Sequence, residues 1–314
     1  MKNLIITVAS LFTFQSFAQI AAFNHIRIER KDGKIFVAGP KCDFLNKEAK
    51  AMAQWSQKLK EKTKESSCSC PGDGTYCYKD ITDIAPDFVV AHHDKRAQVM
   101  GPNSFNAALQ SSKILTQARY TSGTEMNFWM NSPLCRERGA NEPLSPGDLG
   151  LIRNKKDGDV HGFVHVTENL AFSKNNFQTN QPYALQLPEE IFDHHNVPKE
   201  CRKISGIPAQ CSSWINFFSC KTLDEYIKEK PIKSQDAKKA FEQLSDIECS
   251  IGEAVVNGKS NPTLRSFVVD NLVILNNMAF DVIKGKKFLQ EDKVIWQAIF
   301  HRTKSLSGQM DYLP

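Results

Sequence analysis

The sequence predicts an α+β protein, and three stretches carry that prediction. Residues 25–39 (HIRIERKDGKIFVAG) alternate apolar and polar residues on both sides of Asp32-Gly33, a pattern that favours a β-hairpin. Residues 148–174 hold short runs of strand character separated by turn residues. Residues 263–305 repeat apolar side chains every three or four positions, which predicts helices. Strands grouped before helices are typical of the α+β class.

The order of the remaining elements follows from the same patterns. Apolar spacing predicts a surface helix over residues 45–65, and a Cys- and Gly-bearing loop follows at 66–77. Next we expect a helix over about 104–118 and a second over 121–132, capped by Ser122 or Thr124. The strands are expected as an antiparallel meander at 148–153, 160–167 and 169–174, and the last helices at 263–285, ending at a glycine, and 288–305.

The first eighteen residues have the pattern of a cleavable secretory signal. They carry Lys2, a short apolar stretch and a small-x-small ending, so we expect cleavage near Ala18 and a secreted or periplasmic protein. The apolar run is short and interrupted by polar residues, and no other part of the sequence predicts an integral membrane segment. The formal net charge of +5 is spread along the chain, which favours a solvated surface over nucleic-acid binding.

Nine cysteines follow the signal, and export makes disulfides the expected state. The groups Cys68/Cys70/Cys77 and Cys201/Cys211/Cys220 indicate local disulfides around loops, although the pairing stays open. Cys135 is followed by Arg136 and Arg138, which favour a reactive thiolate, but it follows a predicted helix, and a disulfide is the expected role. A zinc knot of Cys68, Cys70, Cys77 and His92 or His93 is the alternative.

Residues 101–112 (GPNSFNAALQSS) read as a turn that opens a helix. A helix N-terminus concentrates positive partial charge, which activates a nucleophile placed there and stabilises an oxyanion beside it. Ser104 is therefore a candidate nucleophile. The alternative is that Asn103 or Ser104 is a plain helix cap.

A candidate base and a third member follow Ser104 in the chain. Strand alternation places His161, Phe163 and His165 on one face, with Val160, Gly162, Val164 and Val166 on the other. His161 would act as the base, and Ser173 on the next strand would orient its ring. Asn103 and His165 are candidate substrate-binding residues, and a surface position is the alternative for His165.

At this point the sequence resembles the NlpC-type cell-wall peptidases, secreted papain-like enzymes that cut peptidoglycan peptides. The similar pieces are GPNSFNAAL, PGDLGLIR, HGFVHV and LAFSKN, which span residues 101–175 in the family's order. The resemblance implies a papain-like core, a helix packed on an antiparallel meander, and an added helical C-terminal region. It implies a peptidoglycan-peptide ligand and no cofactor or metal.

The departure from the family is at the nucleophile, where the family has Cys and this chain has Ser104. A serine hydroxyl keeps its proton at neutral pH, and the helix dipole is too weak to ionise it. We therefore expect an envelope protein with a groove for amide-containing wall peptides and weak or absent catalysis. The alternatives are an active serine amidase or endopeptidase, and a disulfide-stapled interaction protein without catalysis.

The predicted organisation has four segments. They are a signal peptide at 1–18, a hairpin, helix and Cys-rich loop at 19–84, the NlpC-like core at 85–195, and a Cys-containing linker with a helical region at 196–314. The clusters 92–94 and 193–195 (HHD and DHH) offer a second metal hypothesis, and solvated loops explain them equally well.

Overall fold

The computed structural model describes residues 26–55, 68–70, 76–258, 262–285 and 288–313. The predicted signal peptide and the end of the predicted helix at 45–65 lie outside these residues. The chain divides into two compact units. Unit 1 comprises the chain up to Val90 together with Val166–Leu170, and unit 2 comprises Ala91–His165 and Ala171–Pro314. The two predicted segments 85–195 and 196–314 thus fall largely within one unit.

Unit 1 contains the predicted hairpin. Strands β1 (Arg27–Lys31), β2 (Lys34–Gly39) and β3 (Cys77–Asp80) form an antiparallel sheet in that order. The hairpin turns at Asp32 and Gly33, whose φ angles of 51° and 78° are positive, as the tight turn requires. Helix α2 (Cys42–Ala53) follows and buries Leu45, Ala49 and Met52 at helical spacing.

The loop Val166–Leu170 joins unit 1 through one buried carboxyl group. Glu48 of α2 accepts hydrogen bonds from the Thr167 hydroxyl and from the Asn169 side-chain amide, the latter at 2.8 Å. Burial raises the pKa of Glu48. Helix α3 (Asp87–His92) ends this part of the chain.

Unit 2 is built on a six-stranded sheet with the order β4-β9-β5-β6-β7-β8. Three of its strands are the predicted meander: β5 (Leu149–Asn154), β6 (Gly158–Thr167) and β7 (Leu170–Lys174). β4 (Cys135–Glu137), β8 (Tyr183–Gln186) and β9 (Ser213–Cys220) were not predicted. β9 pairs antiparallel with both β4 and β5, so a strand distant in sequence completes the sheet.

Helix α4 (Ser104–Ser111) is shorter than the predicted 104–118. Its last hydroxyls bond back to the helix: Ser111 donates to the Ala107 carbonyl and Ser112 to the Leu109 carbonyl. Lys113 then takes a positive φ of 57°, a conformation that ends a helix. Helix α5 (Gly123–Met130) begins at Ser122, whose hydroxyl accepts from the Glu125 amide, which confirms one of its two predicted caps.

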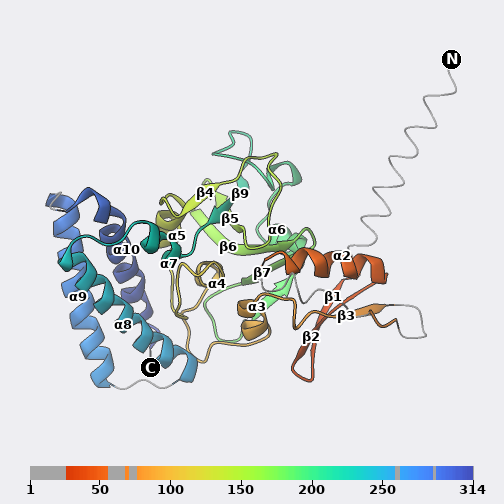
Figure 1. Cartoon of the computed structure of the whole chain (residues 1–314), viewed down its shortest axis with the longest axis horizontal. Helices are drawn as coiled ribbons and strands as arrows, with labels where there is room; N and C mark the ends of the chain where they lie inside the picture. The colour runs from red at the N-terminus through yellow and green to blue at the C-terminus, as the bar shows by residue number, and fades with distance from the viewer. Residues whose placement is uncertain (1–25, 56–67, 71–75, 259–261, 286–287, 314) are drawn as a thin grey trace, which may run out of the picture. The chain divides into compact units, whose positions relative to one another are not determined.

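The helical C-terminal region of unit 2 is confirmed. α8 (Gln235–Asn257), α9 (Pro262–Gly285) and α10 (Lys293–Gln309) lie side by side around an apolar core (Figure 1). The shorter helices α6 (Pro188–His194) and α7 (Leu223–Glu229) precede them. The aromatic side chains of five residues of unit 2 are buried: Phe105, Trp129, Phe163, Phe172 and Trp214.

One described stretch, Arg265–Gly285, is long and apolar enough to cross a membrane by length and composition. Core helices meet the same criteria. In this protein the stretch packs Val268, Leu272 and Leu275 into the core it shares with α8 and α10. That packing is compatible with the predicted absence of an integral membrane segment.

Candidate functional site

Asn103 is the N-cap of α4. Its side-chain oxygen accepts from the Asn106 amide at 3.0 Å, and its side-chain nitrogen donates to the Thr121 carbonyl at 2.7 Å. Both polar atoms of the amide are therefore engaged in holding the helix start. The structure supports the alternative that Asn103 is a helix cap. Its side chain has no polar atom left over for the predicted role in substrate binding.

Ser104 lies where α4 meets β6. Its hydroxyl oxygen accepts a hydrogen bond from the Gly162 amide at 3.3 Å, and the residue is 5% exposed. A methyl group at Gly162 would lie 3.2 Å from the Phe105 ring and 3.4 Å from the Ser104 carbonyl. The helix start thus rests on β6 at the one position of this face that has no side chain.

His161 points to the opposite face of β6. Its ring lies 4.6 Å from that of His195, which caps the end of α6, and the neighbouring Phe163 packs on Phe192. Adjacent residues of a strand point to opposite sides, so Ser104 on the Gly162 side and the His161 ring are turned apart. The predicted pairing of this nucleophile with this base is therefore wrong in geometry.

The predicted alternation holds for three residues and fails for one. His161, Phe163 and His165 share a face, since Phe163 and His165 both contact the Phe217 ring. Val160, predicted on the other face, packs with the Phe163 side. The pairing of β6 with β5 shifts register opposite Val160, and such a bulge reverses the side on which the extra residue points.

The histidines of this face are held neutral. Burial, with the nearby His195 and His194, lowers the pKa of His161 well below its usual value. Burial and the Lys203 charge lower the pKa of His165 to about 4. Nε2 of His161 is buried and has no hydrogen-bond partner among the described residues. His165 is 9% exposed, so the surface alternative for it is wrong.

Ser173 does not orient His161. Its hydroxyl accepts from the Gln186 side-chain amide at 2.8 Å, a contact between β7 and β8. Because Nε2 of His161 is unpartnered, the three predicted catalytic residues share no hydrogen bond through that atom. Each of them instead has a packing role inside unit 2.

A cavity in unit 2 lies away from these three residues, between α5, the β5–β6 turn, α7 and α10. We call it the α5–α10 groove; its volume is about 1460 Å³. Aromatic rings line it: Phe128 stacks on His301 at 4.8 Å, and Tyr226 lies on the α7 side. The amides of Asn127, Asn131 and Gln297 add hydrogen-bonding groups.

The rim of the α5–α10 groove carries both signs of charge. Lys230, Lys233 and Lys293 supply positive charge, and Asp157 and Glu291 supply negative charge. A volume above the roughly 300–1,000 Å³ of small-molecule pockets, with aromatic, amide and charged groups, suits an extended ligand such as a peptide.

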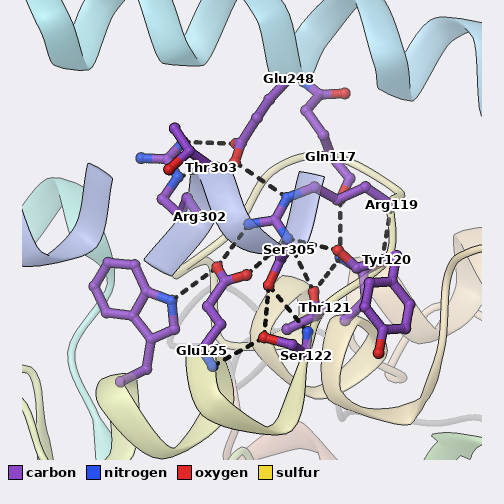
Figure 2. A network of polar contacts seen from close by, with 12 residues as sticks. Gln117, Arg119, Tyr120, Thr121, Ser122, Glu125, Glu248, Arg302, Thr303 and Ser305 are labelled. Carbon is purple, nitrogen blue, oxygen red and sulfur yellow. Dashed lines mark hydrogen bonds and ion pairs between the residues drawn. The ribbon is translucent and has the colours of Figure 1, made fainter. Parts of the chain in front are cut away.

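The groove walls are tied together by four buried charged residues, which we call the ionic cluster: Arg119, Glu125, Glu248 and Arg302 (Figure 2). Arg119 donates to both oxygens of Glu125, at 2.9 and 2.6 Å, and its Nε lies 3.1 Å from Glu248. Arg302 of α10 donates two hydrogen bonds to the Glu248 carboxylate of α8, at 2.9 and 2.6 Å.

Further contacts extend the ionic cluster to the groove. The Trp129 indole donates to Glu125 at 3.2 Å. The Ser122 amide donates to the Ser305 hydroxyl at 3.0 Å (Figure 2). Burial opposes charge on Glu248, but Arg119 and Arg302 outweigh it and lower the pKa of that carboxyl. The cluster has two charges of each sign, so α5 and α10 are joined without net buried charge.

Three cysteine pairs lie at disulfide distance. Cys70–Cys77 and Cys201–Cys211 are local, as predicted. Cys220 pairs with Cys135 instead of with its neighbours, because antiparallel β4 and β9 place these two residues directly opposite each other. This confirms the disulfide role of Cys135. The pairs indicate an oxidising, extracellular environment.

The positions of the cysteines and histidines give little support to either predicted metal site. The predicted zinc knot loses two ligands to the Cys70–Cys77 pair, although Cys42 brings a third sulfur within 4.8 Å of theirs. His93 of the 92–94 cluster accepts from the Leu185 amide at 3.1 Å, and His195 of the second cluster stacks on His161. Neither histidine cluster gathers metal-ligand atoms among the described residues.

No family model, curated protein or solved structure matches this chain significantly. The resemblance to NlpC-type peptidases is carried by the four sequence motifs alone.

Proposed function

We propose that this exported protein binds amide-containing peptides of the cell wall in the α5–α10 groove and does not hydrolyse them. One observation carries the proposal: the α5–α10 groove combines stacked aromatic rings, side-chain amides and both signs of charge. Wall peptides carry amides, carboxylates and amines, so each class of group has a partner there.

Other features support the same assignment. The NlpC-like motifs point to wall peptides as the ligand, and fully buried α4 packed on β6 of an antiparallel sheet is the arrangement a papain-like relative would have. The disulfide pairs and the signal-like N-terminus support export.

The absence of hydrolysis follows from the chemistry at Ser104. A serine needs a base within hydrogen-bond reach to remove its proton during attack. The Ser104 hydroxyl is bonded to the Gly162 amide, and His161 faces away from it. The groove therefore carries the binding function without this catalytic pair.

The test is a calorimetric titration of the full chain with a purified stem tetrapeptide, which measures the dissociation constant. We expect binding by the wild type and about tenfold weaker binding by Phe128→Ala, which removes one stacked ring at a cost of about 1.4 kcal/mol. Phe280→Ala is the matched control, because Phe280 is an exposed aromatic on α9 outside the groove lining. Equal thermal melting of the variants shows that both fold.

Two results overturn the proposal. One is no binding by the wild type, or equal binding by wild type and Phe128→Ala. The other is cleavage of the peptide, seen by mass spectrometry, that disappears in Ser104→Ala. The second result would establish the serine hydrolase alternative.

A further inference from the structure

Four cysteines of unit 1 gather at the start of β3. Cys77 is its first residue, and Ser69 pairs with Tyr78 through two backbone hydrogen bonds of 3.0 and 2.7 Å. This antiparallel bridge sets Cys70 beside Cys77. Cys42, the first residue of α2, and Cys68 complete the group and are both unpaired.

The sulfur of Cys42 touches the disulfide. Cys42 Sγ lies 3.0 Å from Cys70 Sγ, and the sulfurs of Cys42, Cys70 and Cys77 all lie within 4.8 Å of one another. Since Cys70 is bonded to Cys77, the proton in this contact belongs to Cys42. Thiol–disulfide exchange begins when a thiolate attacks a disulfide sulfur. The structure holds the Cys42 sulfur and the Cys70–Cys77 disulfide in contact.

The surroundings distinguish Cys42 from Cys68. Cys42 is the first residue of a twelve-residue helix, and its sulfur is the one in contact with Cys70. Burial and the neighbouring Cys42 raise the pKa of Cys68 to about 11, which keeps its thiol protonated at neutral pH. The Cys68 thiol donates to the Cys42 carbonyl oxygen and to the Asn46 side-chain oxygen, each at 3.5 Å.

We propose that unit 1 carries a thiol–disulfide exchange site in which Cys42 and Cys77 compete for Cys70. The Cys42 thiolate forms a bond to Cys70 Sγ, the Cys70–Cys77 bond breaks, and Cys77 leaves as a thiolate that takes up the proton released by Cys42. One disulfide and one thiol are present before and after, so the step needs no oxidant or reductant.

The cysteines of the exchange site differ in their exposure to solvent. Cys70, common to both, is the exposed member of the group, whereas Cys77 is 8% exposed. An external thiol, either a small thiol or a protein dithiol, therefore meets the site at Cys70. The Cys42–Cys70 form joins the start of α2 to the bridge at Ser69 and releases the start of β3.

The test is disulfide mapping by mass spectrometry after acid quenching and alkylation, using the full chain with Cys249→Ser to remove the exposed third thiol. We expect both Cys70–Cys77 and Cys42–Cys70 in this parent protein. Cys77→Ser should make Cys42–Cys70 the main form, and Cys42→Ser should leave Cys70–Cys77 alone. Cys68→Ser is the matched control and should retain both forms.

The pairs Cys135–Cys220 and Cys201–Cys211 appear in the same maps and report that unit 2 of each variant has folded, and equal thermal melting of the variants and the parent reports the same for unit 1. The proposal is overturned if Cys77→Ser leaves Cys42 and Cys70 both alkylated, or if Cys42 pairs with Cys68. It is also overturned if the four thiols are reduced and hold one equivalent of zinc, measured by elemental analysis of the purified protein.

Discussion

The ionic cluster and the histidine face of β6 bury polar groups in opposite ways within the same unit. Arg119 is fully buried and charged, because two carboxylates surround it. His161 is equally buried, has no partner at Nε2, and stays neutral. A buried charge is stable only when paired, whereas an imidazole can lose its proton instead. The difference shows why a buried histidine does not by itself indicate catalysis.

The same comparison assigns the two regions their roles. The ionic cluster fixes α5 and α10, which both line the α5–α10 groove. The histidine face packs on α6 and Phe217 and contributes to the core of the sheet. Breaking a charge pair and protonating a histidine therefore test different parts of the unit.

The largest effect is expected at the centre of the ionic cluster. Glu248→Ala leaves two buried guanidinium groups without one of their carboxylates, and we expect a loss of about 3–5 kcal/mol in the free energy of unfolding of unit 2. Urea unfolding measures it. Glu242→Ala on the same helix is the control, because Glu242 is exposed and its 4.0 Å contact with Lys238 contributes little. Equal midpoints for both variants would show that the cluster does not hold the helices.

The next largest effect is expected from pH, because His165 on the histidine face is buried in its neutral form. The folded pKa of His165, about 4, lies below its usual 6.5, so between these values the unfolded chain takes up a proton that the folded protein does not. The contribution of His165 to stability is therefore constant above pH 6.5 and falls as the pH falls toward 4.

Urea unfolding at pH 7.5 and pH 5 tests this dependence. We expect His165→Gln to remove about 2 kcal/mol of the loss between the two pH values, at roughly 1.4 kcal/mol per pH unit. The difference between the two proteins at pH 7.5 is the control, because His165 is neutral there in both the folded and the unfolded chain. An unchanged pH dependence in His165→Gln would mean that His165 is not buried neutral.

A smaller effect is expected where α4 meets β6. Gly162→Ala places a methyl group 3.2 Å from the Phe105 ring, and we expect a loss of about 1–3 kcal/mol in stability. Gly139→Ala is the control, since its nearest neighbour would be 3.9 Å away. If thermal melting of Gly162→Ala matches that of the control, α4 does not pack on this face and Ser104 is free to take another position.

Much of the fold was predictable because it depends on local pattern. Asp32-Gly33 marks the hairpin, Gly285 ends α9, and the alternation around Phe163 gives β6. Strand β9 was missed because its place between β4 and β5 is decided by pairing with residues that lie 59 (213 − 154) to 85 (220 − 135) positions away. The end of α4 was missed because hydroxyls of Ser111 and Ser112 compete for helix carbonyls, which apolar spacing does not reveal.

The site was less predictable than the fold. Ser104, His161 and Ser173 have the right residue types in the right order, but their directions depend on which residue of β6 faces α4, and Gly162 does. The α5–α10 groove draws residues from four separate segments, so Phe128 and His301 carry no shared signal in the sequence.

The most direct test of the account is the reactivity of a cysteine placed at residue 104. In Ser104→Cys, alkylation by iodoacetamide is followed against pH at the level of the peptide that contains residue 104, together with hydrolysis of the stem tetrapeptide. Because this position is buried, bonded to Gly162 and turned away from His161, we expect slow alkylation at neutral pH and no hydrolysis. Rapid alkylation below pH 7 together with peptide cleavage, both lost on His161→Ala, would contradict it.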